Sequence, residues 1–161
     1  MSALAIPALD APALVRRGLP ELVFGDQPAA GADFSPVMDG RYYVRLISVF
    51  VRLVTSASVA SREVVVSYED ASGNRFGLAG INTTVTATQT ADYVFSVFQP
   101  EAVATVDSSA LVPLPAMLLL PTQTFKLHVV NIQAADQLSR IRFTWEKFFS
   151  NDQPPGVDFT S

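Results

Sequence analysis

Residues 62–78 read REVVVSYEDASGNRFGL, and this stretch decides the fold. Its first part, residues 62–69, alternates between apolar and mostly polar positions, which is typical of a β-strand with one buried face. The run Asp70–Asn74 contains the residue types that tight turns use. The chain then returns with Phe76 and Leu78 on the side expected to face a core. The pattern therefore predicts a β-hairpin.

Strand patterns continue on both sides of this hairpin. The stretch Tyr42–Thr55 is apolar on both faces and rich in β-branched and aromatic residues, which predicts a buried central strand. Its polar positions fall at helical spacing, so a helix is the alternative there. The closing run Ser139–Phe148 alternates most clearly. The residues expected in the core are Val64, Val66, Tyr68, Phe76, Tyr93, Phe95, Leu127, Ile141, Phe143 and Trp145.

About eight short strands at regular spacing and no long helix indicate an all-β fold. Parallel strands are usually joined by crossover helices, and this sequence offers none that is convincing. We therefore expect a single antiparallel β-sandwich, jelly-roll-like in topology, over residues 41–149. Residues 150–161 form a C-terminal tail in this prediction.

Residues 1–40 differ from the rest of the chain. Prolines recur every five to eight residues, and each disfavours helix in the residue before it. A disordered tail would be polar, yet this segment holds apolar clusters. We expect an extended N-terminal arm that becomes ordered by packing on a neighbouring subunit or another protein. A short helix over residues 11–17 is an alternative for that part of the arm.

The composition suggests self-association. The chain has 161 residues, of which 49% are hydrophobic and only 16% are charged. Ordinary soluble domains carry about 25% charged residues. Apolar surface that solvating side chains cannot cover is expected to pack against another copy or another protein.

Charge and residue content exclude several classes of function. The net charge of −4 argues against nucleic-acid binding, which requires a basic face. The chain has no cysteine, so disulfides and thiolate metal sites are excluded. Apolar runs are too short for a membrane span, and residues 1–7 lack the basic stretch of a signal peptide. We expect no cofactor, no metal and no membrane partner.

We also expect no enzymatic activity. The single histidine, His128, lies on a predicted strand, and no nucleophile motif accompanies it. We interpret it as a partly exposed surface or interface residue. The run Glu69–Asn74 is the best local candidate for calcium, but it lacks EF-hand spacing and its residues suit a turn.

Several apolar side chains are candidates for an interface. The adjacent pairs Tyr42-Tyr43 and Phe148-Phe149 each place one ring away from the core of an alternating strand. The arm adds its apolar anchors, which are too widely spaced to bury one another in an extended chain. The predicted interface residues are Leu4, Ile6, Leu14, Val15, Leu22, Val23, Phe24, Tyr42, Tyr43, Phe148 and Phe149.

Two stretches carry a resemblance to a known class of protein. The first is RYYVRLISVFVRLVT, residues 41–55, followed by ASREVVVSYED, residues 60–70, and Gly73. The second is the closing series of segments between Leu118 and Trp145. Together they resemble small β-sandwich structural proteins of tailed bacteriophage virions.

The resemblance covers about residues 40–148 and rests on the style of strands and turns. It implies a virion protein, assembled in the host cytoplasm, that acts by self-assembly and by packing on other virion proteins. Capsid decoration (a cement protein) is the expected role, with a head–tail connector or a tail component as the alternative. No catalytic residues come with the resemblance.

Two other classes remain as alternatives. One is a carbohydrate-binding β-sandwich that serves host recognition, in which aromatic side chains and Asp/Asn turns bind a sugar. The other is a small hydrolase, for which the sequence nominates no residues.

Overall fold

The computed structural model describes residues 20–80, 84–98, 103–106 and 109–149, with side chains left out at 103–106 and 149. These residues form strands, turns and loops, and no helix. The strands are β1 (Pro20–Phe24), β2 (Tyr42–Val54), β3 (Glu63–Glu69), β4 (Arg75–Ala79), β5 (Thr90–Ser96), β6 (Val103–Val106), β7 (Ser109–Pro113), β8 (Leu118–Leu119), β9 (Thr124–Val130) and β10 (Gln137–Phe149).

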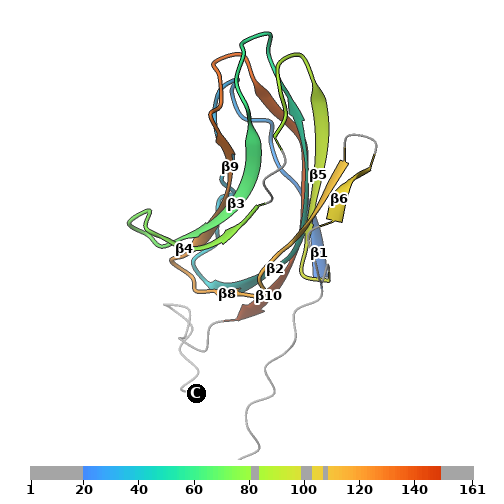
Figure 1. The fold of residues 1–161 in the computed structure, drawn as a ribbon. Helices are drawn as coiled ribbons and strands as arrows, with labels where there is room; N and C mark the ends of the chain where they lie inside the picture. Colours follow the sequence, from blue (N-terminus) through green and yellow to red (C-terminus); the bar gives the residue numbers. More distant parts are fainter. Residues whose placement is uncertain (1–19, 81–83, 99–102, 107–108, 150–161) are drawn as a thin grey trace, which may run out of the picture.

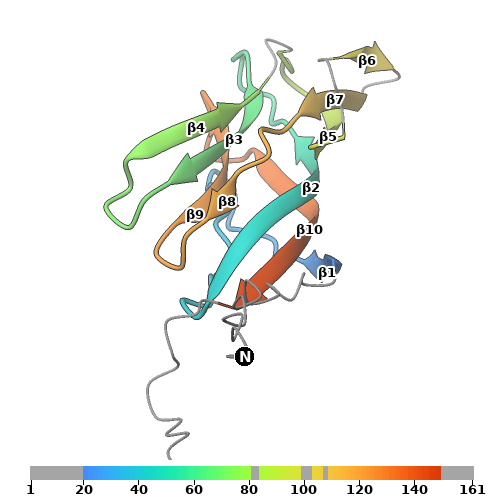
Figure 2. The same cartoon turned by 90° about the horizontal axis from the view of Figure 1, so that it is seen from below.

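The strands build two sheets that lie face to face as two layers (Figures 1 and 2). The large sheet has the order β1-β10-β2-β5-β7-β6, and β8 also pairs with β2. The small sheet has the order β4-β3-β9. The all-β sandwich is therefore confirmed, and β2 is a central strand and not a helix, since β10 and β5 flank it.

One pairing departs from the expected antiparallel arrangement, because β5 and β7 run parallel. The reason is the position of β6, which forms an antiparallel pair with β7 at the outer edge of the sheet. After β5, the chain first forms β6 at the edge of the sheet. It then reverses to form β7 between β6 and β5, so β7 runs in the same direction as β5. The jelly-roll topology is not confirmed.

The sandwich begins earlier than the expected boundary at residue 40. Residues 20–24 form β1, which pairs antiparallel with β10 of the same chain. Further along, Phe34 bridges to Leu127 of β9, and its ring is buried in the core. From Pro20 onward, the described segment therefore packs on its own domain. This is possible because β2 pairs with one side of β10 and β1 pairs with the other. The rest of the arm, residues 1–19, and the tail, residues 150–161, lie outside the described residues, as does the alternative helix over 11–17.

The predicted hairpin is present, but the inward face of β4 was predicted wrongly. Phe76 is 42% exposed and Leu78 is 61% exposed, whereas Ala79 is buried. A register shift next to the turn places Gly77 opposite Tyr68 on the core side. A Cβ at Gly77 would lie 2.9 Å from the Met117 sulfur and 3.0 Å from the Tyr68 ring, so a side chain on this inward position would require Met117 to move.

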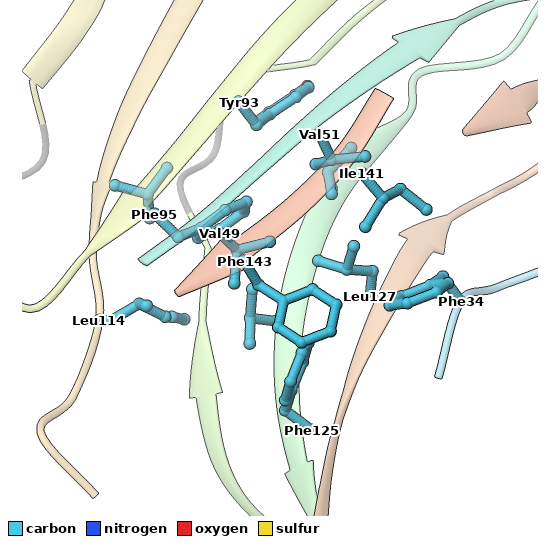
Figure 3. Packing of buried hydrophobic residues seen from close by; sticks show 14 of the residues in the cluster. Phe34, Val49, Val51, Tyr93, Phe95, Leu114, Phe125, Leu127, Ile141 and Phe143 are labelled. Atoms are coloured by element: carbon cyan, nitrogen blue, oxygen red, sulfur yellow. The ribbon is translucent and has the colours of Figure 1, made fainter. Parts of the chain in front are cut away.

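The core lies between the sheets and contains every other predicted core residue (Figure 3). Its centre on the β1 side is a group of aromatic rings around Phe143. The Phe143 ring centroid lies 5.2 Å from that of Phe125 and 4.8 Å from that of Trp145, both edge to face. Phe34 lies 6.1 Å away. The buried residues that confirm the prediction are Val64, Val66, Tyr68, Tyr93, Phe95, Leu127, Ile141, Phe143 and Trp145.

A buried ion pair joins the loops at one end of the sandwich, the top in Figure 1. The side chains of Arg62 and Asp136 are both 0% exposed, with Nε of Arg62 2.8 Å from Oδ2 of Asp136. The Asp136 carboxylate also accepts hydrogen bonds from the backbone N–H and hydroxyl of Ser56 and from the backbone N–H of Gln133. We call this group the loop-end network.

Candidate interaction surface

The face of the large sheet that points away from the small sheet carries an unusual set of side chains. We call it the outer face. In the register of the sheet, Phe24 lies beside Arg142, Arg142 beside Phe50, Phe50 beside Val94, and Val94 beside Leu111. Because paired residues of adjacent strands point to the same face, these five side chains form one row across five strands. No described element covers this row (Figures 1 and 2).

The row is aromatic and cationic at its β1 end. The guanidinium carbon of Arg142 lies 4.6 Å from the centroid of the Phe50 ring, which is a cation–π contact. Among the described residues, Arg142 forms no ion pair. Phe24, its neighbour on β1, is 71% exposed. An exposed phenyl ring beside an arginine whose charge is not neutralised by a partner is the composition that protein interfaces favour.

The acidic groups of the outer face are already paired with arginines. Arg52 donates two hydrogen bonds of 2.7 Å to the two carboxylate oxygens of Asp92. These hydrogen bonds lower the pKa of Asp92, outweighing the opposing effect of partial burial. Glu146 is also paired with an arginine, because Nη2 of Arg45 contacts its Oε2. The face therefore presents apolar and cationic groups to a partner, while its carboxylates are engaged within the sheet.

The outer face brings together four of the predicted interface residues. Leu22 and Phe24 lie on it in β1, and Leu22 is 58% exposed. Tyr43 of β2 pairs with Phe148 of β10, and both rings are half-buried on this face. Their role in an interface stays a prediction.

The remaining predicted interface residues are placed differently. Val23 and Tyr42 are half-buried and pack against the core, because alternation turns them inward. Lys147 lies over the Tyr42 ring, 5.7 Å from its centroid. The side chain of Phe149 and the arm residues Leu4, Ile6, Leu14 and Val15 lie outside the described residues.

Sequence reasoning did not single out Phe50, Val94 and Leu111. Both faces of residues 42–55 are apolar, which hides the positions that point outward. The one local indication of the outward positions was the alternation around Arg45 and Arg52. The pairing register of the sheet is needed to align these three residues with Phe24 and Arg142.

His128 is partly exposed, as expected, and its ring forms a hydrogen bond with the Asp33 carboxylate. Its Nδ1 lies 2.8 Å from Oδ2 of Asp33, and Lys126 lies 3.5 Å from the same oxygen. Burial raises the pKa of Asp33, but the hydrogen bonds from His128 and from the backbone of Val129 lower it. Their effect is the larger one, so the net shift of the pKa is downward. Among the described residues, no hydroxyl group bonds to His128. The pair fastens the Phe34 segment to β9.

The turn considered for calcium uses its carboxylate internally. Asp70 accepts hydrogen bonds from the backbone N–H groups of Ser72 and Asn74, both at 2.9 Å, and from the Asn74 side chain at 3.0 Å. Gly73 has a φ of +79°, which this turn requires. In the part of the chain that the structure describes, no cluster of three metal-binding side chains is found, and no helix is suited to crossing a membrane.

Comparison with known proteins gives no indication of function, so we infer the function from the outer face. No protein-family model and no curated protein matches this chain.

Proposed function

We propose that this protein is a non-enzymatic structural component that works by packing its outer face against other protein subunits. The observation that carries the proposal is the row from Phe24 through Arg142, Phe50 and Val94 to Leu111. An exposed sheet face with aromatic and aliphatic side chains, and with an arginine that has no ion pair among the described residues, is suited to becoming the centre of an interface.

The sequence resemblance extends this proposal to a setting. In it, the protein belongs to the virion of a tailed bacteriophage and binds to capsid subunits as a decoration protein. The alternative position is the head–tail junction or the tail. The low share of charged residues, 16%, supports a protein that is used in an assembled state.

The second candidate is carbohydrate binding, and Phe24 is the feature that favours it. A ring that is 71% exposed offers a face on which a sugar can stack. The other aromatic ring of the row is less suitable, because Arg142 lies over the Phe50 ring.

Sedimentation velocity on the full chain tests the proposal. Val94→Asp places a charge in the row on β5, three strands away from β1, and is expected to weaken self-association about tenfold or more. Val59→Asp is the matched control, because Val59 is 96% exposed in the loop between β2 and β3. The control should associate like the unmodified protein.

Two outcomes contradict the proposal. One is a Val94→Asp protein that is folded and associates as tightly as the control. The other is a protein that stays monomeric at all concentrations and binds members of a glycan array, which supports the carbohydrate alternative.

A further inference from the structure

The strand β1 is an open edge of the large sheet. Gly25 donates its backbone N–H to the carbonyl of Ile141, 2.9 Å away, so residue 25 faces β10. In an antiparallel ladder, successive residues direct their backbone groups to alternate sides. Leu22 and Phe24 therefore direct their N–H and C=O groups away from β10. No described strand pairs with this side of β1.

Among the described residues, this edge has few of the features that usually protect an exposed strand. Natural edge strands carry charges, bulges or a covering segment, because unpaired backbone groups attract other strands. In β1, Glu21 is the one charged residue, and Leu22 and Phe24 are exposed. Val37, on the segment across from β1, is 95% exposed. Apolar side chains thus flank the open edge on both sides.

A groove of about 480 Å³ lies beside the edge, between β1 and residues 33–37. Phe34, Phe143 and Trp145 contribute to its lining. Gly25 allows the close approach of Phe34, since a Cβ there would lie 2.7 Å from the Phe34 ring. An open edge beside a groove is the arrangement that accepts an added β-strand, with backbone groups providing affinity and the groove accepting alternate side chains.

We propose that residues 13–19 of a second copy of this chain add as a strand to β1 and fill the groove. The inference deepens the proposed function, on which it rests, by naming the partner and the segment exchanged. The stretch Ala13–Leu19, ALVRRGL, lies between Pro12 and Pro20 and contains no proline, so each of its residues has an N–H to donate. Seven extended residues span about 23 Å, enough to cover the five residues of β1.

Charge complementarity supports this occupant. The lining of the groove contains the carboxylates of Glu21, Asp26 and Asp33 and no basic side chain. Glu21 and Asp33 are paired with Lys147 and Lys126, whereas Asp26 has no ion pair among the described residues.

The donated stretch supplies Arg16 and Arg17. Consecutive residues of a strand point to opposite faces. One of the two arginines therefore faces the groove in either register.

Pro20 favours exchange between copies over a hairpin within one chain. Pairing of residues 13–17 with their own β1 requires a two-residue turn at Gly18-Leu19, closed by the N–H of residue 20. Proline has no N–H, so that turn lacks its closing hydrogen bond. The nineteen residues before β1 span up to about 60 Å when extended, which is more than the width of a domain of this size.

Cross-linking between copies tests the exchange, and the absence of cysteine from the chain makes the background clean. Full-length Leu22→Cys protein is mixed in turn with Leu14→Cys, Val15→Cys and Arg16→Cys protein and treated with a short bis-maleimide. We expect a covalent heterodimer from at least one mixture. Ser72→Cys, in the exposed turn after β3, replaces Leu22→Cys as the control and should give none.

A second variant removes the open edge without disturbing the pairing of β1 with β10. Leu22→Pro deletes an N–H that points away from β10, and proline is tolerated at such edge positions. We expect it to weaken self-association at least tenfold by sedimentation velocity, with an unchanged circular dichroism spectrum. Leu22→Ala keeps the N–H and is expected to weaken association less than Leu22→Pro does.

The outcomes separate this inference from the proposed function. A cross-link that forms only within a Val15→Cys/Leu22→Cys double variant, and never between mixed copies, shows pairing within one chain and overturns the exchange. The absence of any cross-link also overturns it. If Val94→Asp weakens association but Leu22→Pro does not, the outer face is supported and the exchange is wrong. The reverse result supports the exchange and contradicts the role of the outer face.

Discussion

The loop end and the β1 side of this sandwich are stabilised in opposite ways. At the loop end, Arg62 and Asp136 are withdrawn from water and satisfy each other, with Ser56 and Gln133 completing the contacts of the carboxylate. On the β1 side, stability comes from aromatic rings around Phe143. There, no described strand pairs with the backbone groups of Leu22 and Phe24 that point away from β10.

This difference separates a region built for stability from one available for binding. A buried ion pair tolerates no missing partner, because an uncompensated charge is costly in the interior. An open edge and an exposed phenyl ring destabilise the folded chain only slightly. They contribute stabilising free energy only when a partner covers them. Substitutions at the two regions should therefore affect different measurements.

The largest effect is expected at the loop-end network. Asp136→Ala leaves the Arg62 charge buried without a partner and removes the acceptor of the Ser56 and Gln133 N–H groups. We expect a loss of about 5 kcal/mol in the free energy of unfolding, measured by urea denaturation. Asp92→Ala is the control, because Asp92 pairs with Arg52 at a partly exposed site, and it should cost about 1 kcal/mol or less. Equal losses in the two variants would contradict the contrast between buried and surface pairs.

The next effect is expected in the aromatic group on the β1 side. Phe143→Ala should cost about 3–5 kcal/mol through lost burial and a residual cavity. Thr144→Ala, the neighbouring residue on the outer face, is the control and should change the free energy of unfolding far less. If the two variants unfold at the same denaturant concentration, Phe143 does not hold this region together.

A smaller effect separates the two regions by pH. Burial raises the pKa of Asp136, but the hydrogen bonds from Arg62, Ser56 and Gln133 outweigh it and lower the pKa to about 2 from the usual 3.8. Because the folded-state pKa is the lower one, the stabilisation is fully present above the unfolded value and is lost as the pH falls through about 2.

We expect this carboxyl group to contribute about 2 kcal/mol at neutral pH. The measurement is the free energy of unfolding between pH 5 and pH 2 for the unmodified protein, Phe143→Ala and Asp136→Asn. The first two should share the same acid dependence, whereas Asp136→Asn should lack part of it. A Phe143→Ala protein with the dependence of Asp136→Asn would show that the regions are coupled.

The smallest effect on folding is expected at Phe24. Because its ring is 71% exposed, Phe24→Ser should change the free energy of unfolding by about 0.5 kcal/mol or less. Self-association measured by sedimentation velocity should nevertheless weaken, since the residue belongs to both the outer face and the open edge. A variant that is strongly destabilised would place Phe24 among the residues that stabilise the fold and not among those that bind.

Local alternation was sufficient to predict the strands and most of the core. Val64, Val66 and Tyr68, and likewise Phe143 and Trp145, alternate with mostly polar neighbours, and burial follows this period because successive strand residues point to opposite faces. Alternation also made Tyr43 and Phe148 candidates for the outer face, whereas Leu22 and Phe24 were candidates as apolar anchors of the extended arm.

The tertiary structure decided the features that depend on distant parts of the chain. Phe76 and Leu78 point away from the core because Met117 and Tyr68 fill the space opposite Gly77. β1 belongs to the sandwich because β10, more than a hundred residues later, provides its edge. Arg62 is buried because Asp136 meets it there. Local sequence determines which way a side chain points along its own strand, but only the paired strands and loops determine what it meets.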